Sequence, residues 1–347
     1  MSTAPTPPNA SYLAVRNDWL ARRTEPVLEP DLPIIDPHHH LWERADWTYL
    51  FADLMADIRT GHNILGTVYV QARSMHRADG PEALRPVGET EYVNGVAAMT
   101  ASGFYGKVRV CAGIVGTADL TLGDKVDHVL EAHIRAGGDR FRGIRHIVAW
   151  DADSHVRNPN YSPPAHLLMD TGFRRGFARL APHKLSFEAW LFHPQIDELT
   201  NLAQAFPDTA MILNHVGGPL AIGVYEGRQK EIFPGWAASI KALAKCPNVN
   251  VKLGGLGMRI NGFGFENAID PPSSDRLAEA WKPYIDTCIE AFGAERCMFE
   301  SNVPVDKGSY SYGVFWNACK KLAHGASEAE KIALFAGTAR RVYRLEI

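Results

Sequence analysis

The feature of this chain that most constrains its fold is a regular alternation of short β-branched runs with segments of helical pattern. Strands that alternate with helices in this way pair in parallel, and each helix crosses back over the sheet. Eight such units without a linker between domains predict a (β/α)8 TIM barrel, with a doubly wound sheet as the alternative. The expected strands are residues 33–38, 64–71, 108–115, 141–148, 185–192, 210–214, 249–253 and 297–301.

The expected helices are residues 89–100, 122–136, 164–180, 234–244, 275–292 and 328–343. The last of them should begin at a capping box formed by Ser327 and Glu330. We expect residues 1–31 to form an irregular N-terminal arm and residues 32–347 to form the barrel. The 347 residues, 46% hydrophobic and 22% charged, suffice for one large core of this kind.

Composition also narrows the class of partner. The net charge of −3 gives no basic surface for nucleic acid, and no apolar stretch is long enough to span a membrane, so the partner should be a small-molecule substrate. The oligomeric state stays open, a homo-oligomer included. Five scattered cysteines without a Cys-x-x-Cys pair argue for a reducing, cytoplasmic compartment and against a thiolate metal site. Residues 1–10 lack the pattern of a signal peptide, and we expect a loose arm there.

A run of three histidines follows the first expected strand, in Pro33-Ile-Ile-Asp-Pro-His-His-His-Leu-Trp42. Side chains of a strand alternate between its two faces, so His38 and His40 should share one face with Asp36, and His39 should lie on the other. A His-x-His pair of this kind can hold one metal ion. An exposed histidine run without a role is the alternative.

Further polar residues gather at the carboxyl ends of the expected strands, where barrels of this type have their active sites. Neutral imidazoles there suit zinc or a similar divalent ion with one open position for water. We expect Gln71, Arg145, His146, Arg259 and Trp42 among the substrate contacts, because guanidinium groups match a carboxylate and an indole can wall a ring. Structural ion pairs and plain packing are the alternatives. The strand-end residues are Gln71, Arg145, His146, His193, Asn214, His215, Lys252 and Asn302.

The strand ends, taken in order, resemble those of the amidohydrolase superfamily, and within it the branch of metal-dependent TIM-barrel hydrolases that contains sugar-lactone and dicarboxylate lactonases. The resemblance implies that His38, His40 and His193 bind a metal where one is present, and that His215 assists at the substrate. The motifs that carry it are Asp36-Pro-His-His-His-Leu-Trp42, Phe141-Arg-Gly-Ile-Arg-His146, Phe192-His-Pro-Gln195, Leu213-Asn-His-Val-Gly-Gly218, Val251-Lys-Leu-Gly-Gly255 and Arg296-Cys-Met-Phe-Glu-Ser-Asn-Val-Pro304.

The chain departs from the pattern of this family after the eighth strand. Relatives usually carry Gly-Ser-Asp-x-Pro there, with the aspartate as metal ligand and general base, whereas this chain has Glu300-Ser-Asn-Val-Pro304. The amide of Asn302 cannot take a proton from water, although it can orient one. Glu300, one layer deeper on the same side, or Asp306, in the following loop, could replace the base. The lactonase branch also includes relatives that work without a metal, and this option stays open.

These observations predict a hydrolase that opens a lactone, the cyclic ester of a small sugar acid or carboxylic acid, by attack of an activated water. A bound divalent metal, zinc by preference, or a base without a metal would activate that water. Two other functions are open: a non-oxidative decarboxylase of an aromatic or unsaturated acid on the same barrel, and a non-catalytic barrel that binds a ligand.

Overall fold

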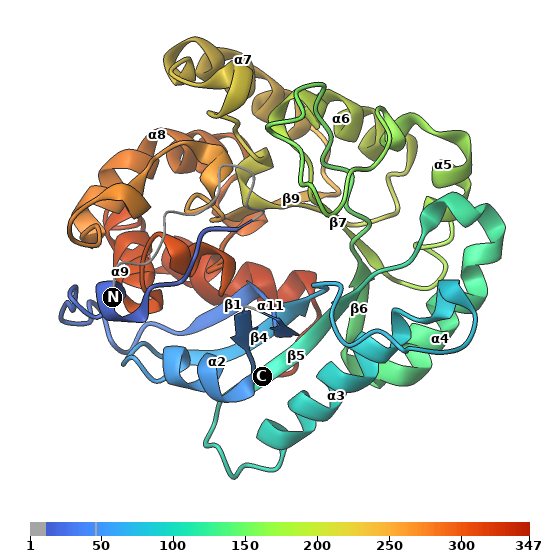
Figure 1. Ribbon diagram of the computed structural model, residues 1–347, viewed down its shortest axis with the longest axis horizontal. Helices are drawn as coiled ribbons and strands as arrows, with labels where there is room; N and C mark the ends of the chain where they lie inside the picture. The colour runs from blue at the N-terminus through green and yellow to red at the C-terminus, as the bar shows by residue number, and fades with distance from the viewer. Residues whose placement is uncertain (1–11, 46) are drawn as a thin grey trace.

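Eight parallel strands, one from each expected unit, form a barrel at the centre of the molecule (Figure 1). The computed structural model describes residues 12–45 and 47–347; the loose arm expected at residues 1–10 lies outside them. The strands follow one another in chain order, which confirms the barrel, because a doubly wound sheet reverses its order. They are β1 (Ile34–His39), β4 (Ile64–Val70), β5 (Arg109–Gly116), β6 (Phe141–Ile144), β7 (Ser186–Ala189), β8 (Met211–Leu213), β9 (Val249–Leu253) and β10 (Cys297–Phe299).

Two strands end at least three residues earlier than the sequence pattern predicts. β6 ends at Ile144 and β7 at Ala189, whereas the expected runs continue to residues 148 and 192. The two segments that follow these strands are still joined, because the backbone N–H of Val148 donates to the carbonyl of Trp190 at 3.1 Å. They do not form a regular ladder of hydrogen bonds. The alternation of side chains between two faces therefore does not extend from β7 to His193.

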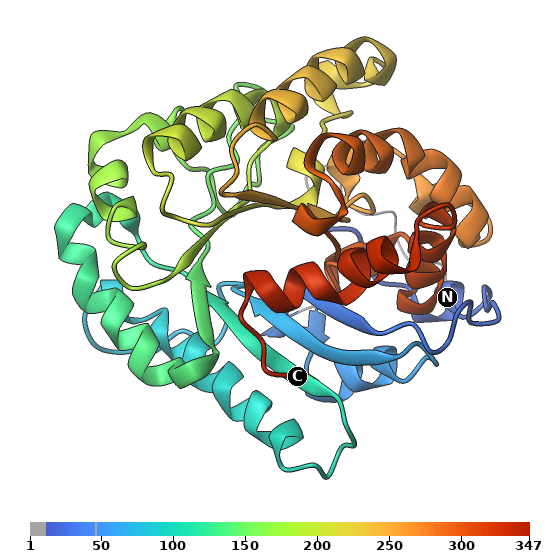
Figure 2. The same cartoon turned by 180° about the vertical axis from the view of Figure 1, so that it is seen from behind.

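Helices surround the barrel (Figures 1 and 2). The pattern at residues 164–180 yields only a short α5, because the carboxylate of Asp170 accepts the backbone N–H of Phe173 at 2.7 Å and caps a helix there. The expected capping box of Ser327 and Glu330 is confirmed, and a π turn at Ala333–Gly337 divides the helix that follows. The helices are α1 (Asn17–Leu20), α2 (Phe51–Ile58), α3 (Val87–Ala101), α4 (Asp127–Gly137), α5 (Thr171–Phe177), α6 (Ile196–Ala205), α7 (Gln229–Leu243), α8 (Ser274–Phe292), α9 (Tyr312–Leu322), α10 (Glu328–Ile332) and α11 (Thr338–Val342).

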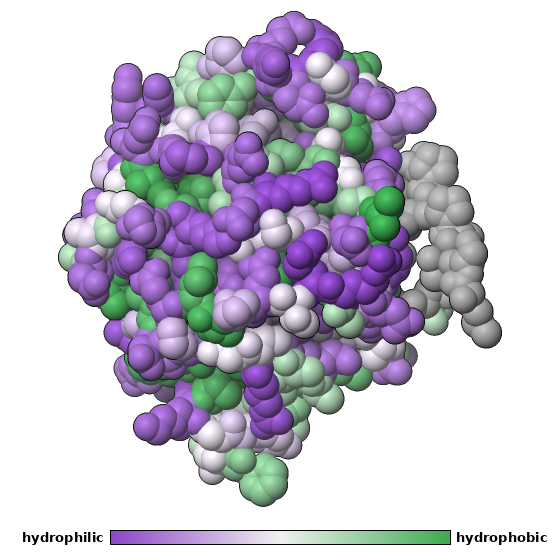
Figure 3. Space-filling model, turned by 90° about the vertical axis from the view of Figure 1, so that its left-hand side faces the viewer, coloured by the Kyte–Doolittle hydropathy of each residue, from purple (hydrophilic) through white to green (hydrophobic). Residues whose placement is uncertain are grey.

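The described part of the N-terminal arm packs on the barrel. The indole N–H of Trp19 donates to the carbonyl of Ile269 at 3.0 Å, and Glu25 accepts the backbone N–H of Ser274 at 2.8 Å, at the start of α8. A short hairpin of β2 (Trp42–Arg44) and β3 (Trp47–Tyr49) follows β1. On the face shown in Figure 3, apolar residues are scattered among hydrophilic ones. None of the helices in the described ranges has the length and apolar content needed to cross a bilayer.

The apolar core has two main parts. The larger lies between the sheet and the surrounding helices, and the smaller fills the inside of the barrel. In the smaller part Ile35, Val68 and Met298 from the strands meet Val342 and Tyr343 from the last helical segment. Figure 2 shows this segment across one end of the barrel. Because this end is closed by side chains, a ligand can enter the barrel only from the other end, where the strands have their carboxyl termini.

The barrel closes where the segment after β10 lies beside β1. The backbone N–H of His40 donates to the carbonyl of Val303 at 2.8 Å, and that of Asn302 donates to the carbonyl of His38 at 3.0 Å. Beneath this seam the wholly buried carboxylate of Asp36 accepts the backbone N–H of Ser301 at 3.0 Å and its hydroxyl at 2.5 Å. These bonds fix the residues on either side of the seam relative to one another.

Asp36 should make the stability of the fold depend on pH. Burial raises the pKa of this carboxyl from 3.8 to about 6, so the folded state holds its proton more tightly than the unfolded chain does. The contribution of the protonated Asp36 carboxyl to the free energy of unfolding is therefore fully present below pH 3.8 and lost as the pH rises through about 6. Relative to Asp36→Asn, which cannot titrate, the wild-type protein should lose up to about 3 kcal/mol of unfolding free energy over this range.

Urea unfolding at pH 4, 5, 6 and 7 measures this difference. The matched control is Asp208→Asn, because Asp208 is exposed and its replacement should change the free energy of unfolding equally at every pH. A difference between wild type and Asp36→Asn that stays constant from pH 4 to pH 6 would show that burial does not perturb Asp36.

Candidate active site

A cavity of about 370 Å³ opens at the carboxyl ends of the strands. Its wall is built by one residue after another from around the barrel: His40 from β1, Gln71 from β4, Arg145 from β6, Trp190 from β7, His215 from β8 and Asn302 from β10. Each of them follows the last or nearly the last residue of its strand. The fold therefore brings together side chains that lie far apart in the sequence.

His215 is held by a buried carboxylate. Its Nδ1 lies 2.6 Å from Oε1 of Glu300, and its backbone N–H donates to the same oxygen at 3.1 Å. A carboxylate can only accept, so the imidazole proton lies on Nδ1 and the lone pair on Nε2. Since the ring lines the cavity, Nε2 is the nitrogen available to a ligand. An Asp or Glu behind a histidine in this way is the arrangement that makes an imidazole a general base.

Two glycines make room for this pair. A Cβ on Gly254 would lie 2.1 Å from the carbonyl oxygen of Glu300, and a Cβ on Gly255 would lie 2.3 Å from Nδ1 of His215. Gly255 also has φ = +69°, a backbone conformation that side chains disfavour. The sequence Gly254-Gly255 after β9 is thus required for His215 and Glu300 to meet.

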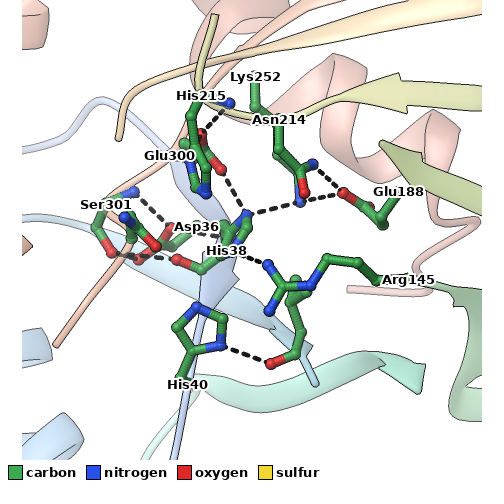
Figure 4. A network of polar contacts seen from close by, with 12 residues as sticks. Asp36, His38, His40, Arg145, Glu188, Asn214, His215, Lys252, Glu300 and Ser301 are labelled. Atoms are coloured by element: carbon green, nitrogen blue, oxygen red, sulfur yellow. Dashed lines mark hydrogen bonds and ion pairs between the residues drawn. The ribbon is translucent and has the colours of Figure 1, made fainter. Parts of the chain in front are cut away.

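His38 lies beneath the cavity between two cations (Figure 4). Nζ of Lys252 is 3.2 Å from its Nδ1, and Nη1 of Arg145 is 3.3 Å from its Nε2. Oε2 of Glu300 is also close to Nδ1, at 2.7 Å. Burial, with Lys252 next in effect, holds the pKa of His38 well below its usual range, so the ring is neutral.

Glu188 completes this buried network. Its carboxylate pairs with Lys252 at 2.9 Å and accepts bonds from the amide of Asn214 and the hydroxyl of Tyr343. Glu188, Lys252 and Glu300 are wholly buried. Removing one charge from such a network leaves its partner uncompensated, at a cost of about 3–5 kcal/mol. Glu188 therefore keeps Lys252 in place beside His38.

The two other histidines of the run lie as the alternation predicts. Nδ1 of His40 donates to the carbonyl of Val70 at 2.7 Å, which leaves Nε2 as an acceptor in the cavity. Burial and the nearby Arg145 hold the pKa of His40 well below its usual range. His39 points to the opposite face, where its Nε2 meets the hydroxyl of Thr67 at 2.8 Å.

Asn302 reaches the cavity, and Asp306 stands behind it. The amide Nδ2 of Asn302 donates to Oδ1 of Asp306 at 2.9 Å, so the amide oxygen is left for the cavity. The other carboxylate oxygen of Asp306 accepts the backbone N–H of Gly257 at 3.0 Å and the hydroxyl of Tyr310. Burial raises the pKa of Asp306 to about 7. Asp306 does not line the cavity and orients Asn302, which argues against its expected role as the base.

The structure brings together most, but not all, of the residues expected from the sequence. His146 lies outside the cavity: its Nδ1 accepts the backbone N–H of Leu120 at 3.2 Å, because it follows Arg145 and points to the other face. His193 also lies outside it, where its Nδ1 accepts the backbone N–H of Leu220 at 3.2 Å. The expected residues that line the cavity are His40, Trp42, Gln71, Arg145, His215, Arg259 and Asn302.

Glu188 is the functional residue that the sequence analysis missed. The expected strand of residues 185–192, continued to His193, puts Glu188 on the face opposite to His193, but β7 ends at Ala189, before His193. Trp190 lines the cavity and lies two residues after Glu188, so the alternation of side chains puts Glu188 on the face that points into the barrel. An acid within a run of otherwise apolar strand residues was the signal that could have revealed it.

His38, His215 and Glu300 form a group that could hold a metal ion, since their ligand atoms lie within 4.8 Å of one another. The contact of Glu300 Oε2 with His38 lacks the alignment of a hydrogen bond, so this buried oxygen has no donor among the described residues. A cation would complete it. Two neutral imidazoles and a carboxylate are ligands that zinc accepts. The donor set therefore fits a divalent ion, with Glu300 and His215 in the positions where His40 and His193 were expected.

Comparisons with known proteins identify the family of this chain. The model of the family described as Amidohydrolase matches residues 35–345. An uncharacterized protein of Sinorhizobium fredii, y4mH, is 33% identical over 91% of this chain and 99% of its own length. An L-fucono-1,5-lactonase of Burkholderia multivorans is 25% identical over 90% of this chain and 96% of its own. A crystal structure of an amidohydrolase from Burkholderia multivorans with bound zinc superposes with a TM-score of 0.69 at 25% identity, covering 90% of this chain and 99% of that chain.

The two ligand sets can be told apart by zinc titration of metal-free protein. If His38, His215 and Glu300 hold the ion, Glu300→Gln should weaken zinc binding at least about tenfold, because it removes the only charged ligand. His193→Ala should leave the affinity unchanged, since His193 lies outside the group. Isothermal calorimetry measures both affinities. Loss of zinc binding in His193→Ala, with full binding in Glu300→Gln, would return His193 to the ligand set.

Proposed function

Because this chain belongs to the amidohydrolase family and is a hydrolytic enzyme, we propose that it opens a lactone of a small sugar acid or carboxylic acid by attack of water. The observation that supports the proposal best is the pair of His215 and Glu300. Nε2 of His215 is an acceptor at the cavity wall, and Nδ1 of the same ring is bonded to the buried carboxylate of Glu300. The similarity to L-fucono-1,5-lactonases supports a cyclic ester as the substrate.

In the proposed reaction His215 acts as the general base. Nε2 takes a proton from a water that attacks the lactone carbonyl, and Glu300 stabilises the imidazolium that forms. The amide oxygen of Asn302, fixed by Asp306, can accept the second hydrogen of that water and so orient it. When the ring C–O bond breaks, the proton on Nε2 passes to the leaving oxygen. Water and lactone thus give one hydroxy acid, and His215 returns to its first state.

The negative charge that develops on the carbonyl oxygen requires a donor. Arg145 supplies one, since its guanidinium lines the cavity and is held by the carbonyl of Gln71. His40 cannot donate there, because its only proton is engaged by Val70, and it is suited to accept a substrate hydroxyl. The buried position of Arg145 strengthens its effect on the reacting group.

The alternative form of the proposal includes a divalent ion such as zinc: His38, His215 and Glu300 would hold it, and His215 would then be a ligand instead of the general base. When bound, such an ion would supply a Lewis acid beside the lactone carbonyl. Lys252 and Arg145 flank His38 and would repel the metal ion, whereas Glu188 and Glu300 would attract it. These opposed charges balance, so the ion should be held less tightly than in a site built of ligands alone.

His215→Ala tests the assignment of the base. A positioned acid or base contributes about 10²–10⁴-fold to turnover, and we expect kcat on the best lactone of a panel to fall by that factor. Because the ring is 2% exposed and bonded to Glu300, the melting temperature of the variant is measured as well, and kcat is compared at a temperature at which the variant is folded. A variant that keeps the wild-type rate would contradict the role of His215.

Glu300→Gln separates orientation from packing. The amide is nearly the same size but stabilises a protonated imidazole less, so the acid limb of the pH–rate profile should move to lower pH while kcat falls. His193→Ala is the matched control and should keep both the rate and the profile. Proton release and carbon dioxide are measured separately in these assays, since a decarboxylase on this barrel would release gas and a lactonase would not.

A further inference from the structure

The cavity wall is positively charged, whereas the chain as a whole has a net charge of −3. Among the described residues, no aspartate or glutamate lines it, whereas five arginines do: Arg44, Arg73, Arg145, Arg157 and Arg259. The whole chain has 39 acidic residues against 36 lysines and arginines. The positive excess is thus local to the cavity. A cleft lined by one sign of charge attracts ligands of the other sign.

Four of these arginines lie further out than Arg145. Arg145 is 5% exposed, and the other four, here called the mouth arginines, are half-buried or exposed. Two of them are fixed by stacking on aromatic rings: Cζ of Arg44 lies 4.1 Å from the ring centre of Trp42, and Cζ of Arg73 lies 4.8 Å from that of Tyr161. A stacked guanidinium keeps the N–H groups at its edge free for a ligand.

Backbone carbonyls hold the same two side chains. Arg44 donates to the carbonyl of Ala72 at 3.1 Å, and Arg73 donates to that of Asn160 at 3.2 Å. Each guanidinium has five N–H donors, so one such bond leaves most of them for a ligand. Within residues 12–45 and 47–347, Arg44, Arg73 and Arg157 form no ion pair with a carboxylate. Like charges gathered in this way repel one another, and an anionic ligand would relieve the repulsion.

We infer that the substrate is a lactone with a carboxylate remote from the ester, which the mouth arginines bind while the ring lies beside His215 and Arg145. This inference rests on the proposed function and narrows it. L-Fucono-1,5-lactone, named for two relatives, is a neutral ring whose hydroxyls need acceptors as well as donors. Arginines can only donate. A carboxylate, in contrast, matches the two parallel N–H groups of a guanidinium.

The shape of the mouth leaves room for such a group. Arg157 and Arg259 also line an adjoining hollow of about 190 Å³, together with Ser154, His155 and Pro159. A substituent that extends from the ring can therefore reach past the main cavity and still meet both guanidinium groups. The reacting ester and the carboxylate are bound by different residues, so changes at the mouth should affect binding more than the chemical step.

The test uses a matched pair of substrates, a γ-butyrolactone carboxylate and its primary carboxamide. We expect the wild-type protein to favour the carboxylate in kcat/KM by about 100-fold, since hydrogen bonds to charged groups contribute on the order of 10- to 100-fold each. Arg73→Gln and Arg157→Gln should each lower this preference about tenfold, mainly through KM. Arg73→Lys should recover only part of it, because an ammonium lacks the paired donors. Arg135→Gln, on α4 away from the cavity, is the control and should keep the preference.

Binding of the ring-opened diacid to His215→Ala, measured by calorimetry, separates this inference from the proposed function. If no lactone is opened but the diacid binds and the Arg73 and Arg157 changes weaken it, the anion site stands and the lactonase proposal fails. If lactones are opened with equal kcat/KM for carboxylate and carboxamide, the inference is overturned and the lactonase proposal stands. Diacid binding that Arg73→Gln and Arg157→Gln leave unchanged, in variants with wild-type melting temperatures, also overturns it.

Discussion

The site depends on a balance of buried charge around His38. Two carboxylates, Glu188 and Glu300, offset two cations, Lys252 and Arg145, and the imidazole between them stays neutral. Each buried charge is costly alone and acceptable only with its partners. The four side chains come from β7, β9 and the ends of β6 and β10, so they also join separate parts of the barrel. The geometry of His215 follows, because Glu300 takes part in both the balance and the orientation of that ring.

The sequence predicted the barrel because its signal is local and repeated, and it predicted the faces of His38 and His40 because strand alternation needs only neighbours. It failed where strands ended early. His146 lies outside the cavity because it follows Arg145 and points to the other face, and β7 stops before His193, so that histidine leaves the face that the pattern assigns to it. Glu188 was missed for the same reason. The end of a strand is set by contacts between distant segments, which no local pattern contains.

The missing aspartate after the eighth strand shows what a sequence can indicate without resolving. Asn302 marked a departure and left Glu300 and Asp306 as two alternatives. The structure separates them by depth: Glu300 meets His215 within the barrel, whereas Asp306 is bonded behind Asn302. That outcome also requires Gly254 and Gly255, because any side chain there would occupy the space of the pair. The ends of three strands, β8, β9 and β10, therefore meet at this pair, and only the folded chain shows the connection.

The seam that closes the barrel imposes an order on biosynthesis. Asp36 is made early, yet its partner Ser301 lies 265 residues later. At about 5–20 residues per second, a ribosome needs roughly 13 to 53 s to cover that distance. During this interval β1 has a carboxylate and three histidines but no neighbour on one edge, and Glu188 likewise waits for Tyr343. A nascent chain that pairs its strands in order would therefore be an open sheet with one unpaired edge, and His215 and Glu300 can meet only after the segment that follows β10 has been made.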